Sequence, residues 1–376
     1  MKVLLISPLD PIVPSDLKFL MGGENTYTRM LLSQKLKGVQ FVHVEDALEQ
    51  GLVSYGALHY LFLILQRLRI LSPGPRVYVL DLHESFDLVY THVYPVKISE
   101  RDQPLVISDS SSNIVFLEKY VKWSKFQIQI AQIIKRLVFK LFGIVDSEVN
   151  HQSSHNMFVF SAWAKRIKKV EFEIDNCEVI YPGLPIPKFH KRKVRSGRDL
   201  KILFVGVWFE RKGGRLTLEA FIQLQKKYPR IKLTIFGQLP HDVSIDRNNS
   251  IIQKDFVSYE KLLTAYQTHD VLVSVPPEVE GYGMAVTEAM SYGVVPVVSN
   301  VCVLPEFVEH TKSGLVVQAG SVEDLVKALE LLITNRKMRR MLSLGARKRF
   351  LNQFSTRVFH NKLYSWFLKS LIKKSR

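Results

Sequence analysis

The amino-acid sequence predicts an α/β protein made of two doubly wound, Rossmann-like domains, each built on a parallel sheet. Short apolar, β-branched runs alternate with longer helical patterns along both halves of the chain, as in parallel sheets that helices cover on both faces. A length of 376 residues suits two cores better than one. A stretch rich in proline and glycine separates the two series, as expected of a linker.

The strand candidates follow from these runs. In the first half they are residues 2–7, 41–45, 77–81, 88–91, 105–108 and 158–160. In the second half they are residues 201–205, 232–236, 251–256, 271–275, 294–299 and 314–317. Helical patterns follow two of these strands, at about 215–228 and at 284–292.

The linker sets the domain boundaries. The segments YPGLPIPK (181–188) and HKRKVR (190–195) cannot form a helix or strand interior. We therefore expect a first domain at 1–182, a linker at 183–198 and a second domain at 199–354. A C-terminal helix at 355–376 is expected to pack back toward the first domain.

Composition and charge limit the partners. Two cysteines give no disulfide framework, and no apolar run reaches the ~20 residues of a spanning helix. The net charge of +17 indicates anionic lipid, nucleic acid or phosphorylated substrates. Because zinc-finger spacing, RNP-like motifs and basic-leucine heptads are missing, nucleic acid is not an expected partner. We expect a cytoplasmic protein, peripheral on the inner face of a membrane.

Two loops of the second half carry the candidate site. The loop in FVGVWFERKGG (204–214) enters a helix, so glycine amides, the helix N-terminus, Arg211 and Lys212 indicate an anion site. A solvated turn is the alternative. The loop EGYG (280–283) also enters a helix, with Glu280 in the loop and Glu288 on the helix. Taken singly, these acids read better as a cap and a surface charge; as a pair, we expect them to flank a ligand.

The run EGYGMAVTEAMSYGVVPVV (280–298) resembles the pattern of glycosyltransferase family 4, the retaining transferases of the GT-B fold. The resemblance is close from about residue 201 to 335 and weak elsewhere. It implies a GT-B fold whose two domains face a central cleft, with the acceptor side in the first domain and the donor site in the second. It also implies transfer of a sugar from a nucleotide-diphosphate sugar with retention at the anomeric carbon.

The resemblance implies a role for each matching residue. Glu288 would accept hydrogen bonds from the donor ribose, and Glu280 would hold sugar hydroxyls beside the anomeric carbon. Lys212 and Arg211 would neutralise the diphosphate leaving group. Val207 stands where many members carry a phosphate-binding arginine, and Arg211 is the expected substitute. The remaining donor-binding candidates of this half are Gly206, Gly281, Tyr282, Gly283, Met284 and Ala285.

The first half offers further candidates. Gly22 and Gly23 resemble the family loop that approaches the donor phosphates, although an ordinary helix start is the alternative. The family places a histidine near the sugar hydroxymethyl group. Here either His92 or the group of Asp109 and Ser111 would take that place; otherwise His92 packs or caps.

The stretch 119–142 has two readings. One helical face collects its apolar residues at steps of three and four, and lysines and Arg136 cover much of the remainder. The apolar face comprises Trp123, Phe126, Ile130, Ile133, Leu137 and Leu141. Either it packs in the core, or the stretch is a basic amphipathic helix on an anionic membrane. Residues 364–376 add a second basic, aromatic element.

The expected enzyme is a hexosyltransferase whose acceptor is a glycan or a lipid-linked hydroxyl. No Asp-x-Asp occurs in a metal-site context, and we expect neither a metal nor a cofactor, because the nucleotide-diphosphate sugar is itself the donor substrate. The alternatives are a nucleotide-sugar epimerase and a non-catalytic, basic membrane- or polyanion-binding protein on a GT-B scaffold.

Overall fold

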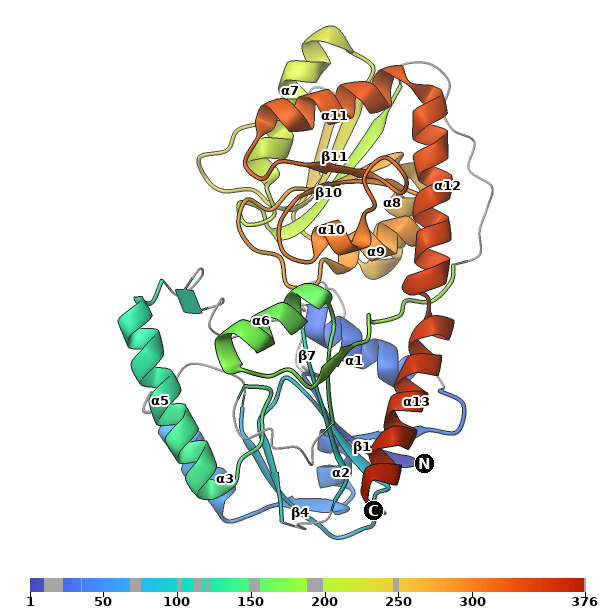
Figure 1. Cartoon of the computed structure of the whole chain (residues 1–376). Helices are drawn as coiled ribbons and strands as arrows, with labels where there is room; N and C mark the ends of the chain where they lie inside the picture. Colours follow the sequence, from blue (N-terminus) through green and yellow to red (C-terminus); the bar gives the residue numbers. More distant parts are fainter. Residues whose placement is uncertain are drawn as a thin grey trace. The chain divides into compact units, whose positions relative to one another are not determined.

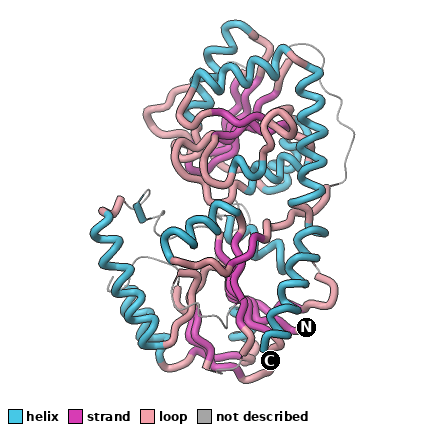
Figure 2. The backbone as a smooth tube through the Cα atoms, viewed as in Figure 1, coloured by secondary structure: helices cyan, strands magenta, loops and turns pink. Residues whose placement is uncertain are grey.

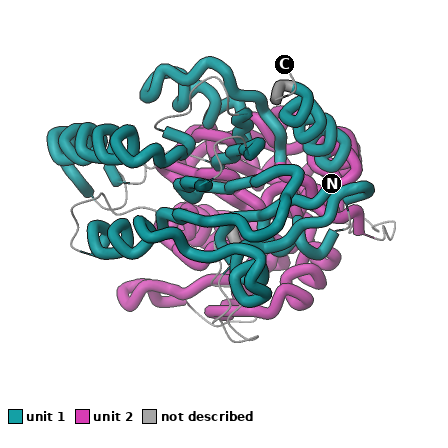
Figure 3. Tube along the Cα trace, turned by 90° about the horizontal axis from the view of Figure 1, so that it is seen from below, with its two compact units in different colours: residues 1–10, 24–181, 359–376 teal, residues 11–23, 182–358 magenta. Residues whose placement is uncertain are grey.

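The chain divides into two compact units, which Figure 3 colours separately. Unit 1 consists of Met1–Asp10, Glu24–Tyr181 and Phe359–Arg376, and unit 2 of Pro11–Gly23 and Pro182–Val358. A computed structural model of the protein describes residues 1–9, 23–34, 36–67, 76–99, 103–110, 117–118, 122–148, 156–187, 199–245 and 250–374.

Unit 2 is built on six parallel strands in the order β12-β11-β10-β13-β14-β15 (Figures 1 and 2). The strands are β10 (Lys201–Trp208), β11 (Lys232–Gln238), β12 (Ile251–Lys254), β13 (Val271–Ser274), β14 (Val295–Ser299) and β15 (Leu315–Val317). The helices are α7 (Gly214–Lys227), α8 (Tyr259–Thr268), α9 (Met284–Ser291), α10 (Leu304–Phe307), α11 (Val322–Thr334) and α12 (Arg336–Gln353). Strands β13 and β14 are buried throughout, and β10 is buried over residues 202–204, because helices cover both faces of a parallel sheet.

Unit 1 has its own six-stranded parallel sheet, in the order β2-β1-β5-β7-β8-β9. These strands are β1 (Lys2–Ile6), β2 (Gln40–His43), β5 (Leu88–His92), β7 (Leu105–Asp109), β8 (Asn156–Val159) and β9 (Cys177–Val179). The helices of this part are α1 (Gly23–Ser33), α2 (Val44–Glu49), α3 (Leu58–Arg67), α5 (Lys125–Phe142), α6 (Ala162–Phe172) and α13 (Thr356–Lys374).

A second, three-stranded sheet in unit 1 departs from the prediction of parallel sheets alone. It comprises β3 (Val53–Tyr55), β4 (Tyr78–Leu82) and β6 (Val96–Ile98). Its strands β3 and β4 run antiparallel, so the run predicted at 77–81 lies outside the main sheet. Strands β3, β6 and β9 were not predicted, because a polar residue interrupts each of these three-residue strands, whereas the equally short β15 is a continuous apolar run.

The C-terminal helix α13 packs its aromatic residues onto unit 1. The Phe367 ring lies 5.6 Å from the Tyr90 ring and 6.3 Å from the Phe41 ring, measured between centroids. Phe359 lies 6.0 Å from Tyr27 in the same way. Among the described residues, no helix is both long enough and apolar enough to span a bilayer.

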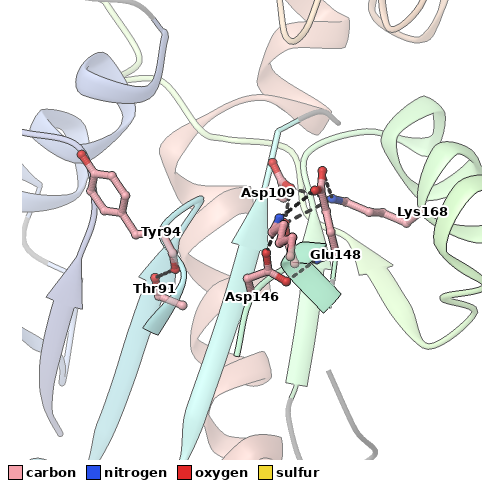
Figure 4. Close-up of polar contacts among 8 residues, drawn as sticks. Thr91, Tyr94, Asp109, Asp146, Glu148 and Lys168 are labelled. Atoms are coloured by element: carbon pink, nitrogen blue, oxygen red, sulfur yellow. Dashed lines mark hydrogen bonds and ion pairs between the residues drawn. The ribbon is translucent and has the colours of Figure 1, made fainter. Parts of the chain in front are cut away.

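A buried network of charged side chains lies where β7 ends, beside α5 and α6 (Figure 4). Lys168 Nζ lies 2.7 Å from Asp109 Oδ2 and 3.9 Å from Glu148 Oε1. The other oxygen of Glu148 lies 2.9 Å from Lys135 Nζ, which is also 2.6 Å from Asp146 Oδ2. Glu148 therefore joins a lysine of α5 to a lysine of α6, and the network holds both helices in place.

Replacing Lys168 by methionine should destabilise the protein strongly. The change leaves the carboxylate of Asp109 buried without the ammonium beside it, and removing one partner of a buried pair costs about 3–5 kcal/mol. Urea denaturation measures the loss in free energy of unfolding. The control is Lys169→Met, because Lys169 pairs with Asp175 at the exposed surface, where such pairs contribute little. Equal free energies of unfolding for the two variants would show that the buried network does not stabilise the fold by this amount.

Candidate functional site

The two loops singled out in the sequence follow neighbouring strands at the centre of unit 2. Strands β10 and β13 pair in parallel, with Phe204 opposite Val273. The strand order reverses between them, since β11 and β12 lie on one side and β14 and β15 on the other. Loops at the carboxyl ends of such strands diverge and leave a crevice, which is where doubly wound sheets bind ligands.

Glycines allow the first loop to pack tightly. Gly213 has φ +81°, and a Cβ there would lie 2.1 Å from the carbonyl oxygen of Val275, the first residue after β13. A side chain at Gly206 would come within 2.8 Å of the Lys212 stem. The loop therefore lies against the base of its neighbour, and Lys212 lies across Gly206.

This packing brings Lys212 and Glu280 into contact. The Lys212 ammonium pairs with Glu280 Oε2, although 68 positions separate the two residues. Their side chains are 18% and 5% exposed. Burial alone would raise the pKa of Glu280. The positive charges of Lys212 and, to a smaller extent, Arg211 outweigh this effect, together with a hydrogen bond from the Gly283 backbone N–H, and hold the pKa below its usual value. Glu280 is therefore ionised at neutral pH.

The backbone of the second loop turns at Gly283. This residue has φ +69° and caps the N-terminus of α9, a conformation that favours glycine. Gly281, Met284 and Ala285 are partly exposed around it, so the start of α9 is not covered by other parts of the described chain. Tyr282 is buried instead, and its hydroxyl donates to the carbonyl of Pro182 at 3.1 Å.

Glu288 lies on α9 with partners of its own, apart from the Lys212 pair. The hydroxyl of Tyr266 donates to Glu288 Oε2 at 2.9 Å, and that of Tyr259 to Oε1 at 3.3 Å. Burial raises the pKa of Glu288 to about 7, although both tyrosine hydrogen bonds act in the opposite direction. Glu288 thus titrates near neutral pH.

Sequence reasoning missed these two tyrosines. Both belong to α8 and are seven positions apart, which places them on one face of the helix. That spacing was the available signal, but it does not identify the residue they contact. Among the described residues, no three His, Cys, Asp or Glu side chains form a group that could hold a metal ion.

The first-half candidates divide between the two units. Gly22 lies outside the described residues, and Gly23, which begins α1, is counted with unit 2. His92 belongs to unit 1 and ends β5, the neighbour of β1, where the strand order of that sheet reverses.

The contacts of His92 are those of a core residue. Its ring is fully buried, stacks 4.7 Å from the Phe160 ring and shares a 2.7 Å hydrogen bond with Ser108 Oγ. Its contact with the donor stays a prediction that this packing does not favour. Of the alternative group, Asp109 is engaged by Lys168, and by Ser147 at 2.5 Å, and Ser111 lies outside the described residues.

Comparison with known sequences identifies the domain that holds this site. The family described as Glycosyl transferases group 1 matches residues 185–349. An uncharacterized glycosyltransferase of Haemophilus influenzae is 27% identical over 184 residues, which cover 46% of this chain and 50% of the relative. The chain spans half or less of the length of the curated relatives it matches.

Solved structures extend the likeness to the whole chain at the level of the fold. Sucrose-phosphate synthase of Thermosynechococcus elongatus superposes with a TM-score of 0.65 at 14% identity, covering 98% of both chains. The Anabaena protein HepE, solved with UDP-glucose, has a TM-score of 0.63 at 13% identity and covers 97% of this chain and 98% of its own. Residues 185–349 are therefore a glycosyl transferases group 1 domain, in a chain that has the GT-B fold of two Rossmann-like halves.

Proposed function

We propose that the protein is a retaining glycosyltransferase, which moves a sugar from a nucleotide-diphosphate sugar to an acceptor hydroxyl. The observation that carries the proposal is the pairing of Lys212 with Glu280 at the strand-order reversal of unit 2. A buried cation beside an ionised acid suits a donor that offers an anionic diphosphate and a polar sugar together. The family match of the same segment supports this reading.

The diphosphate is assigned to Lys212 and the start of α9. An ammonium has three protons, so Lys212 can keep its bond to Glu280 and still donate to phosphate oxygens. Met284 and Ala285 are partly exposed at the start of α9 and add backbone N–H donors at a helix N-terminus, which favours anions. Arg211 contributes further positive charge next to the pair.

The acids are assigned to the two sugars of the donor. Glu280 stays ionised and therefore accepts hydrogen bonds from hydroxyls of the transferred sugar. Glu288 accepts from the ribose hydroxyls once it has lost its proton, and the phenols of Tyr259 and Tyr266 hold its carboxylate in position.

In the proposed reaction the bond between the anomeric carbon and the phosphate oxygen breaks. The acceptor oxygen attacks the anomeric carbon from the same face, and its proton passes to the departing phosphate oxygen. The products are a glycoside with the donor's anomeric configuration and a nucleoside diphosphate. Lys212 stabilises the negative charge that develops on the leaving group. Electrostatic stabilisation of this kind is usually the largest single contribution to lowering the activation barrier. The proposal requires neither a metal nor a cofactor.

The acceptor and the location belong to the same proposal. We assign a glycan or lipid-linked acceptor and a place on the inner face of a membrane. The net charge of +17 supports an anionic membrane surface or an anionic substrate as the partner. UDP-glucose is the first donor to test, since a structural neighbour was solved with it, followed by a panel of other nucleotide sugars.

The pair itself can be tested by Lys212→Met and Glu280→Gln. Each should lower the rate of nucleoside diphosphate release from the active donor by about 100-fold or more, because each removes a group aimed at the reacting centre. Lys226→Met serves as the control, since Lys226 is exposed at the far end of α7. Normal turnover in either site variant would refute the assignment.

The double variant Lys212→Met/Glu280→Gln separates folding from chemistry. Each single change alters one side of a buried charge pair, whereas the double change removes both charges. We expect its Tm to exceed that of Lys212→Met while turnover stays absent. NMR of the product tests retention separately, and an inverted anomer would remove that part of the proposal alone.

Glu288 predicts a pH dependence of donor binding. Its pKa of about 7 in the free protein leaves it mostly protonated below neutral pH, and the ionised form is the better acceptor. UDP-glucose should therefore bind about tenfold more tightly at about pH 8 than at about pH 6. Calorimetry on Glu288→Gln should show weaker binding without that slope. The same slope in both proteins would assign the titration to another group.

A further inference from the structure

Helix α5 presents its apolar face to solvent. Ser124 caps its start in a capping box with Gln127, and Gly143, with φ +66°, ends it, so the helix is well defined at both ends. Five large apolar side chains at steps of three and four are exposed along it, from 42% to 78% of their surface. They are Phe126, Ile130, Ile133, Leu137 and Leu141. Of the two readings of this stretch, core packing of the apolar face is thus wrong for these five residues.

The orientation of α5 follows from its buried side. Lys135 lies nine residues from Phe126, which is about 180° around the helix at ~100° per residue. It points inward to Asp146 and Glu148. Burial alone would lower the pKa of Lys135, but these two carboxylates outweigh it and hold the pKa above its usual value. The ion pairs therefore keep a cation inward and the apolar face outward.

Helix α3 widens the exposed apolar surface. It lies beside α5 (Figure 1), with the Phe62 ring 6.2 Å from the Phe139 ring and 5.6 Å from the Phe142 ring. Tyr60, Leu61 and Ile64 of α3 are exposed. These two neighbouring helices supply eight of the nineteen large apolar side chains exposed among the described residues, so exposed apolar surface is concentrated on them.

The charged side chains exposed on α3 and α5 are all basic. Lys125, Arg136 and Lys140 are exposed on α5, and they fall within about 60° of one another on one flank of the apolar face. Arg67 is exposed at the end of α3. Neither helix contains an Asp or Glu, so an anionic partner meets no repulsion there.

We propose that the face made by α3 and α5, with its basic flank, docks on an anionic lipid bilayer. An amphipathic helix with an apolar face and a basic flank lies in the headgroup region with its apolar side chains inserted. A second copy of the chain fits less well. A two-fold interface pairs the same face of both copies, so it would bring the basic flanks of both copies into one interface. The inference rests on the membrane location within the proposed function and not on the donor chemistry.

Vesicle flotation of the full chain tests the docking. We expect the protein to float with vesicles of phosphatidylcholine and phosphatidylglycerol and to float poorly with phosphatidylcholine alone. Ile133→Asp/Leu137→Asp should reduce flotation at least tenfold. Leu344→Asp is the matched control, because Leu344 is equally exposed, at 58% against 57% for Ile133, but lies on α12. Arg136→Gln/Lys140→Gln should reduce binding to the anionic vesicles on the order of tenfold.

The outcomes separate this proposal from the donor site. UDP-glucose binding by Ile133→Asp/Leu137→Asp should match the wild type in the absence of vesicles. Loss of donor binding in every protein, with flotation intact, would overturn the transferase proposal and leave the docking standing. Three outcomes would overturn the docking surface. One is a wild type that does not float with anionic vesicles, and another is Ile133→Asp/Leu137→Asp floating as well as the wild type. The third is a dimer that this variant breaks, without any vesicle binding.

Discussion

The buried pairing of Lys212 with Glu280 depends on one constraint of the backbone. Strands β10 and β13 are neighbours, so two loops far apart in sequence leave the sheet side by side. Gly213 fits against the Val275 carbonyl with no room for a Cβ, and this contact sets the distance between the loops. A side chain at that glycine would push the two loops apart and so separate the ammonium from the carboxylate.

The sequence predicted the elements that carry long, repetitive patterns. The six strands of unit 2 and helices α7 and α9 appear near the expected positions, because buried parallel strands are continuous apolar runs. Glu280 and Glu288 were singled out by their place in one long run. Tyr259 and Tyr266 were not, because their contact with Glu288 joins two helices and leaves no local trace. The roles of these residues in binding a donor remain predictions.

Helix α5 shows a second limit of periodicity. The spacing from Phe126 to Leu141 establishes an apolar face, but spacing alone does not tell whether protein, water or lipid lies against it. Lys135 decides the matter in the structure, because its two carboxylate partners belong to the segment that follows the helix. A cation in the middle of the opposite face looked like part of a solvated surface, and its burial could be known only from the tertiary contacts.

Tyr282 links the loop of Glu280 to the two ends of the segment Pro182–Val358, which makes up most of unit 2. Its hydroxyl donates to the carbonyl of Pro182, the first residue of that segment. Its ring lies 4.9 Å from the Phe307 ring, which in turn lies 5.2 Å from the Phe354 ring.

Phe354 lies near the other end of the segment, and its carbonyl accepts a 2.8 Å hydrogen bond from the Leu184 backbone N–H. The two ends of the segment Pro182–Val358 are thus joined to each other and to the loop of Glu280. The Tyr282 phenol, two positions after Glu280, therefore ties its loop to both ends of this segment, directly at Pro182 and through Phe307 at Phe354.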